Sequence, residues 1–174
     1  MDAKVVFETE RLVVRDWADA DGDRVFDIYR RWEVSRWLGA TPRAMPDRDA
    51  ATRVIERWNA RNADPVHGVW AVEEKATGVV AGTVLLVPLP AGPEPGRGEV
   101  EVGWHFHPDA WGRGLATEAA SGAIGHGFKA GLPEIYAVVR PDNQASLAVC
   151  RRLGMRRLGL TKRWYDAELE SFVI

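Results

Sequence analysis

Two glycines stand where a strand is expected to give way to a helix, in the run Trp111-Gly112-Arg113-Gly114-Leu115-Ala116. Backbone N–H groups in the first turn of a helix have no intrahelical partner, and the helix dipole makes that end partly positive. Glycine lets a ligand approach the backbone closely, and Arg113 adds a full positive charge. The junction could therefore hold a pyrophosphate. The alternative is a tight turn in which glycine serves only as a cap.

The elements on both sides of the junction are predicted from periodicity. Residues 99–106 alternate apolar and polar side chains, with Glu101 and His105 on the polar face, which is typical of a half-buried strand. Pro108 ends that strand because it cannot donate a ladder hydrogen bond. Residues 115–128 are mostly small and favour a helix. The glycines therefore lie where the chain leaves a strand and enters a helix.

The junction resembles motif A of the GNAT superfamily of acyl-CoA-dependent N-acyltransferases, whose pattern is Gln/Arg-x-x-Gly-x-Gly/Ala. Gly114 and Ala116 match this motif, and Trp111 stands in the Gln/Arg position. The longer run from Val102 to Ala119 is similar to the branch that includes the ribosomal-protein-alanine N-acetyltransferases, which tolerates tryptophan there. The resemblance implies that acetyl-CoA binds at Trp111, Gly112, Arg113, Gly114, Leu115 and Ala116.

A second stretch, from Asn143 to Met155, resembles motif B of the same superfamily. Asn143 matches a position whose amide contacts the pantetheine arm of the cofactor, and Ser146 matches a serine near the departing thiolate. Alternatively, these two residues only cap and begin a helix. Many relatives have a tyrosine, acting as general acid, where this chain has Cys150. A lone cysteine is more often a small buried hydrophobe, so we assign Cys150 to the core.

Transfer of an acetyl group to an amine needs a base, because alkylamines are protonated near neutral pH. Glu101 is the favoured base: it aligns with a glutamate common in this branch, and partial desolvation would raise its pKa. It could instead pair with an arginine across the sheet. His105 and His107 are weaker alternatives, since each could titrate near pH 7 or simply face solvent. The resemblance also implies that the backbone N–H of Phe106 or His107 polarises the thioester carbonyl.

Two further charged features are interpreted as structural. Glu118 lies in the first turns of the expected helix, where a carboxylate suits the dipole and caps backbone groups. A basic cluster is interpreted as a solvated face of the protein. The alternative is that this cluster contacts the 3′-phosphate of coenzyme A. That cluster consists of Arg151, Arg152, Arg156 and Arg157.

The rest of the chain supplies the elements that must position these residues. One helix is expected to present Val25, Ile28, Tyr29 and Trp32 on one face. A loop rich in proline and glycine is expected at 88–98. Further strands are expected at 9–15, 69–73, 79–87, 135–139, 158–163 and 171–174, and further helices at 32–38, around 51–58 and at 145–153. This order predicts an α+β fold, GNAT-like, in which helices flank a mixed, mostly antiparallel sheet with a splayed central strand pair, in a single domain of residues 1–174.

Composition excludes several classes of function. The net charge of −2 gives no basic footprint for nucleic acid, and no apolar run is long enough to span a membrane. One cysteine excludes an internal disulfide framework, and no Cys/His spacing suggests a metal site. The N-terminus lacks the basic and apolar regions of a signal peptide, so a cytoplasmic location is expected. Eight tryptophans would suit a homodimer interface or an aromatic acceptor pocket.

These features predict an N-acetyltransferase that moves an acetyl group from acetyl-CoA to a primary amine by direct attack in a ternary complex. The acceptor is left open between a protein N-terminus, an antibiotic and a small metabolite amine. The alternative is a catalytically inactive acyl-CoA-binding sensor or partner-binding module of the same fold, because the tyrosine acid is absent.

Overall fold

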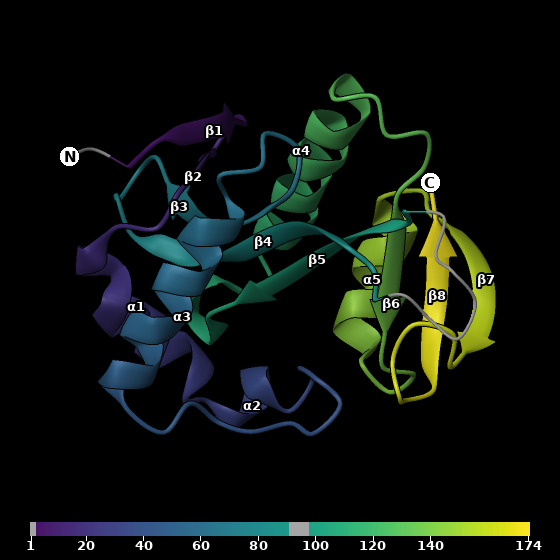
Figure 1. The fold of residues 1–174 in the computed structure, drawn as a ribbon, viewed down its shortest axis with the longest axis horizontal. Coiled ribbons are helices and arrows are strands. Elements are labelled where there is room, and N and C mark those ends of the chain that lie inside the picture. The colour runs from purple at the N-terminus through teal and green to yellow at the C-terminus, as the bar shows by residue number, and fades with distance from the viewer. Residues whose placement is uncertain (1–2, 91–97) are drawn as a thin grey trace.

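A computed structural model describes residues 3–90 and 98–174, and within these residues the chain forms one eight-stranded sheet with flanking helices (Figure 1). The strands are β1 (Val5–Glu8), β2 (Leu12–Arg15), β3 (Gly68–Glu74), β4 (Val80–Pro88), β5 (Val100–Phe106), β6 (Tyr136–Val139), β7 (Arg156–Thr161) and β8 (Leu169–Val173). The helices are α1 (Gly22–Tyr29), α2 (Trp32–Ser35), α3 (Arg48–Arg61), α4 (Leu115–Lys129) and α5 (Gln144–Arg152), with short 3-10 helices η1 (Asp19–Asp21) and η2 (Pro108–Ala110). Residues 91–97 of the loop expected at 88–98 lie outside the described part. None of the described helices has the length and apolar character needed to cross a membrane.

The sheet runs in the order β1-β2-β3-β4-β5-β6-β8-β7. The described strand pairs are antiparallel except β5 and β6, which are parallel and pair only at Glu101 and Tyr136. By contrast, β4 and β5 stay paired along the whole length of β5. β5 and β6 therefore meet at one end and diverge toward the other (Figure 1). The predicted mixed, mostly antiparallel sheet with a splayed central pair is confirmed.

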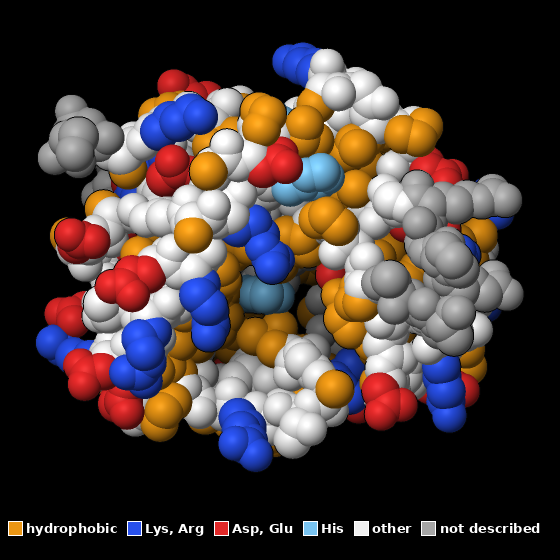
Figure 2. All heavy atoms as spheres, viewed as in Figure 1, with side chains coloured by type: hydrophobic (Ala, Val, Ile, Leu, Met, Phe, Trp, Pro, Cys, Tyr) orange, Lys and Arg blue, Asp and Glu red, His pale blue; other side chains and the backbone are white. Residues whose placement is uncertain are grey.

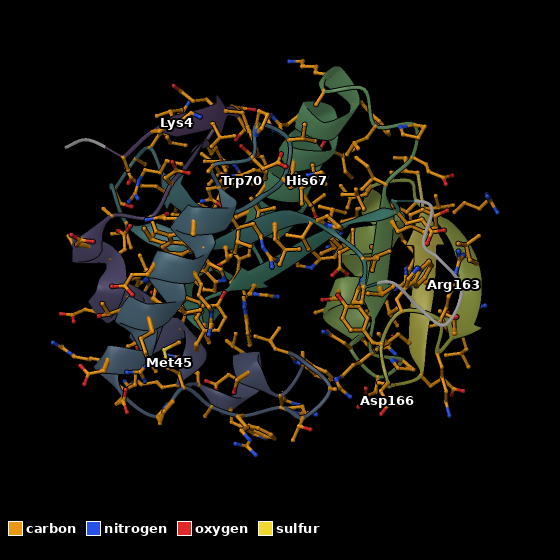
Figure 3. All side chains as sticks on the ribbon, in the orientation of Figure 1. Lys4, Met45, His67, Trp70, Arg163 and Asp166 are labelled. Carbon is orange, nitrogen blue, oxygen red and sulfur yellow. The ribbon has the colours of Figure 1, made fainter. Side chains whose placement is uncertain are left out.

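Helices cover both faces of the sheet, so that neighbouring residues of β3 pack into two different cores. On one face, Ala71 packs in a core with Ile55 of α3. On the other face, Trp70 belongs to the larger core that α4 completes. Its ring, labelled in Figure 3, lies 5.5 Å from that of His126 on α4, measured between centroids. Packing against the sheet therefore fixes α4 with its first turn close to the end of β5.

The structure differs from the expected elements near the N-terminus. The strand expected at 9–15 begins only at Leu12, and β1 adds an edge strand that pairs antiparallel with β2. Trp32 does not continue the buried face of α1, because Arg31 before it has an extended backbone (φ −78°, ψ 120°). Trp32 instead opens α2, with 55% of its surface exposed.

Candidate active site

The junction between β5 and α4 contains two glycines in the left-handed conformation. Gly112 has φ +72° and Gly114 has φ +76°, which L side chains rarely adopt, and Gly114 is the N-cap of α4. The Gly114 carbonyl accepts the backbone N–H of Glu118 at 3.1 Å, which closes the first turn. The N–H groups of the first turn itself have no partner within the helix. α4 thus presents its positive end at the junction.

A cavity of about 770 Å³ opens over this first turn, within the size range of small-molecule sites. The facing wall comes from α2 and α5. Most of the residues expected to bind the cofactor line this cavity: Phe106, Trp111, Gly112, Gly114, Leu115, Ala116 and Asn143. We call it the first cavity.

Thr117 also lines the first cavity, and sequence reasoning missed it. Its buried hydroxyl has no hydrogen-bond partner among the described residues. Such an unpartnered group costs roughly 1–3 kcal/mol, which a ligand could offset. The hydroxyl and the free N–H groups beside it are donors that match the acceptor oxygens of a pyrophosphate. The signal that could have found Thr117 is a single hydroxyl in the first turn of a helix that begins with small apolar residues.

The side chain of Arg113 lies elsewhere. Its guanidinium donates to both carboxylate oxygens of Glu74, at 2.8 and 2.5 Å, and it is not among the lining residues of the first cavity. Its carbonyl accepts a hydrogen bond from Arg11 at 2.9 Å. The positive charge that the sequence suggested for the phosphate site is therefore already paired with a carboxylate, and the helix end supplies the positive potential instead.

His107 is also committed to other contacts. Its backbone N–H donates to the carbonyl of Ala81 at 2.9 Å, so it is not free to polarise a thioester. Its ring Nε2 lies 2.8 Å from a carboxylate oxygen of Asp27, and its ring Nδ1 accepts the backbone N–H of Asp109 at 3.1 Å. His107 lines neither of the two cavities described here. The geometry therefore does not support His107 as an oxyanion donor or as a base.

Phe106 has the opposite backbone orientation. In an antiparallel pair, alternate residues direct their N–H and C=O groups toward the partner strand. The bond from His107 to Ala81 shows that the odd-numbered residues of β5 face β4. The N–H of Phe106 therefore faces the gap where β5 and β6 diverge. Its carbonyl accepts the indole N–H of Trp111 at 2.9 Å, which ties that tryptophan to the strand end.

A second cavity of about 650 Å³ lies on the other side of this gap. Tyr29, Glu101 and Tyr165 are among its lining residues. Figure 2 shows the molecular surface hollowed at the centre of one face, with apolar side chains around the opening. Six residues line both cavities and mark where they meet: Trp37, Leu38, Trp104, His105, Asn143 and Ser146.

Glu101 has the environment expected of a base. Burial raises its pKa from 4.5 to about 7, and the hydroxyl of Tyr165, which donates to its carboxylate, only partly opposes this rise. Glu101 takes part in none of the ion pairs among the described residues, so the alternative of an arginine partner across the sheet is not realised. A carboxyl group with this pKa is half ionised near pH 7 and can accept a proton there.

Tyr165 is held in place by its neighbours in the connection between β7 and β8, where Figure 3 labels Arg163 and Asp166. The indole N–H of Trp164 donates to Glu99 at 2.7 Å, and Arg163 pairs with the same carboxylate at 2.9 Å. Glu99 lies just before β5. This connection is therefore anchored beside the strand that carries the base, and sequence reasoning did not anticipate it.

His105 lies four residues beyond Glu101 in β5, lines the same cavity and is hydrogen-bonded to Tyr29. Its ring Nδ1 is 3.0 Å from the hydroxyl oxygen of Tyr29, and that hydroxyl donates to Thr83 at 2.7 Å. Desolvation lowers the pKa of His105 to about 4. The ring is therefore neutral at pH 7 and a much weaker proton acceptor than Glu101.

Of the motif B residues, Asn143 and Ser146 lie at the site and Cys150 lies in the core. The side-chain oxygen of Asn143 accepts the backbone N–H of Ser146 at 3.2 Å, which confirms the helix N-cap. The amide nitrogen of Asn143 makes no hydrogen bond to another described residue, and both residues line both cavities. Cys150 is fully buried in the larger core, and burial raises its pKa to about 12. The core assignment of that cysteine holds.

Of the two charged features interpreted as structural, Glu118 is fully hydrogen-bonded away from the cavities, whereas the basic cluster is only partly paired. The Glu118 carboxylate accepts from the Thr9 hydroxyl at 2.6 Å and from the backbone and side chain of Arg11 at 2.8 and 2.6 Å. In the basic cluster, Arg157 donates to Glu170 at 2.9 Å, and Arg152 lines the first cavity. Within the described part of the chain, no group of His, Cys, Asp and Glu side chains is arranged to hold a metal.

Comparison with known proteins gives the context of this site. The acetyltransferase (GNAT) domain model matches residues 11–156. The uncharacterized N-acetyltransferase YoaA of Bacillus subtilis (strain 168) is 28% identical over 176 residues, covering 97% of this chain and 96% of YoaA.

Many solved structures share the fold, and two of them illustrate the match. The ribosomal-protein-S5-alanine acetyltransferase from Vibrio fischeri superposes with a TM-score of 0.75 at 20% identity, covering 97% of this chain and 94% of that one. RimJ of Mycobacterium smegmatis, in complex with CoA-disulfide, gives a TM-score of 0.75 at 20% identity, covering 94% of this chain and 81% of that one.

Proposed function

The chain belongs to the acetyltransferase (GNAT) domain family and is an acyltransferase, and from this premise we propose that it moves an acetyl group from acetyl-CoA to a primary amine. One observation carries the proposal: two cavities meet at the gap beside β5, with a positive helix end on one side and a carboxyl group of pKa about 7 on the other. The alternative of a catalytically inactive module of the same fold gains no support from the comparisons.

The first cavity would hold acetyl-CoA, which supplies the acetyl group as a thioester. Free N–H groups in the first turn of α4 and the hydroxyl of Thr117 would donate to the pyrophosphate. The unpaired amide nitrogen of Asn143 would donate to the pantetheine arm, as the motif B resemblance implies. The coenzyme A group bound to RimJ supports this choice of donor.

The second cavity would hold the acceptor. Glu101 accepts a proton, through water, from the ammonium form of the acceptor, because it lies five residues along β5 from Phe106, and this leaves a neutral amine with a free electron pair. The amine nitrogen attacks the thioester carbon, and the C–N bond forms as the C–S bond breaks. The Phe106 N–H donates to the carbonyl oxygen as negative charge grows there. The sulfur leaves as a thiolate, and the nitrogen of the new amide gives up its second proton, which Ser146 or water relays to that thiolate, so the products are the amide and the coenzyme A thiol.

Release of coenzyme A from acetyl-CoA, followed with a thiol reagent, tests the proposal across peptides, aminoglycosides, polyamines and amino acids. We expect steady release that depends on the amine. Glu101→Gln should slow turnover roughly 10²–10⁴-fold, the usual contribution of a positioned base, and should keep its affinity for acetyl-CoA by calorimetry. Binding of acetyl-CoA without release for any amine would contradict the proposal.

A further inference from the structure

The wall of the second cavity is rich in positive charge. Arg57, Arg61 and Arg140 line it, whereas Glu101 is the single carboxylate among its described lining residues. Figure 2 shows Lys and Arg side chains over α3, next to the central hollow. Because Glu101 is only half ionised near pH 7, it offsets a small part of this charge. An occupant with negative charge would be favoured there.

Arg57 and Arg61 are the two arginines in the wall of the second cavity whose side chains have no partner among the described residues. They lie one turn apart on α3, and neither makes an ion pair or a side-chain hydrogen bond among the described residues. Two other arginines of α3 have acidic partners: Arg48 lies 2.9 Å from Asp23, and Arg53 lies 3.9 Å from Asp47. Like charges four residues apart destabilise a helix slightly.

These two arginines are not placed for the phosphates of the donor. Both line the second cavity and neither lines the first, where the N-terminus of α4 lies. The positive charge of Arg61 also acts to lower the pKa of Tyr165, the residue whose hydroxyl donates to Glu101. The guanidinium group of Arg61 therefore lies on the same side as the base.

The remaining wall is largely aromatic and aliphatic. Trp37, Trp58 and Trp104 contribute aromatic surface. Leu38, Leu85 and Leu169 contribute aliphatic surface. The lining therefore offers an occupant a proton acceptor at Glu101, apolar side chains and two unpaired guanidinium groups. Arg140 adds to the positive field, although one of its nitrogens already donates to the carbonyl of Gly39 at 2.6 Å.

We propose that the acceptor is an amine that also carries a carboxylate, which Arg57 and Arg61 bind while the amine lies at Glu101. This inference rests on the proposed acetyl transfer, since it assigns the acceptor of that reaction. Guanidinium groups bind carboxylates with two parallel hydrogen bonds, so the pair would select an acid over its amide. The carboxylate belongs either to a small amino acid or to an acidic side chain near the N-terminus of a peptide.

Matched acid and amide pairs test the inference. The pairs are phenylalanine with phenylalaninamide, 6-aminohexanoate with 6-aminohexanamide, and Ala-Asp-Phe-amide with Ala-Asn-Phe-amide. Binding is measured by tryptophan fluorescence, because three tryptophans line the cavity, and transfer by coenzyme A release. We expect one or more acids to be preferred roughly 10–100-fold, in Kd and in kcat/KM, as charged hydrogen bonds allow. A preference among the small acids or in the peptide pair identifies the source.

Variants separate recognition from catalysis. In Arg57→Gln and Arg61→Gln the preference for the acid should fall to about threefold or less, because a neutral amide cannot replace the charged donor. Arg53→Gln, on the same helix and paired with Asp47, is the matched control and should keep the full preference. Equal binding of acids and amides, binding of neither, or a preference that survives both variants would overturn the inference. Acid-selective binding without any acetyl transfer would contradict the proposed function and leave the recognition assignment standing.

Discussion

Replacement of Glu101 by glutamine should stabilise the protein in a pH-dependent way. Burial raises the pKa of this carboxyl from 4.5 to about 7, and each pKa unit corresponds to about 1.36 kcal/mol. Ionised Glu101 therefore costs the folded protein roughly 3 kcal/mol more than it costs the unfolded chain. This cost is absent below the unfolded pKa of 4.5, grows as the pH rises and is complete above about 7. Glutamine cannot ionise, and it keeps an oxygen that can accept from Tyr165.

Urea unfolding of both proteins at pH 5 and pH 8 measures this effect. The stability advantage of Glu101→Gln over the wild type should grow by roughly 2–3 kcal/mol between the two pH values. Glu56→Gln, at an exposed position on α3, serves as the control and should show the same difference from wild type at both. If the Glu101→Gln advantage is also the same at both pH values, the reasoning from burial to a raised pKa is refuted.

Three other variants test separate parts of the site. Gly114→Ala should raise the Kd for acetyl-CoA about tenfold in calorimetry, because binding must restore a left-handed turn that costs alanine about 1–2 kcal/mol; an unchanged Kd would count against the cradle. Ser146→Ala should lower kcat far less than loss of the base does, whereas Cys150→Ser should leave kcat nearly unchanged; an inactive but folded Cys150→Ser protein would contradict its place in the core. Tyr165→Phe removes a hydroxyl that stabilises the ionised base, so the acidic limb of the pH–rate profile should move to higher pH; a limb that stays in place would show that this contact does not tune the base.

Features that depend on local spacing could be predicted from the sequence. The alternation around Glu101 places its side chain on one face of a strand, and the structure has that strand. The two glycines before Leu115 are needed where the backbone turns left-handed, and both have positive φ. Asn143 precedes a helix and caps it. In each case the physical requirement acts within a few residues of the chain.

Features that depend on distant partners could not be predicted in this way. Arg113 was expected to face a phosphate, but it pairs with Glu74, which is 39 residues away in the chain. His107 is 80 residues from Asp27, which holds its ring. Tyr165 donates to Glu101 across 64 residues. Such contacts depend on which strands and loops become neighbours in the sheet, and no spacing in the sequence encodes that.

The central claim is that Glu101, in the wall of the second cavity, takes the proton from the acceptor amine. The pH dependence of kcat/KM for acetyl transfer, in wild type and in Glu101→Gln, tests it most directly. The wild type should show a break at about pH 7, below which the rate falls as the carboxylate becomes protonated. The variant should be roughly 10²–10⁴-fold slower and should lack that break. A Glu101→Gln enzyme with the wild-type rate and the same break would contradict the claim.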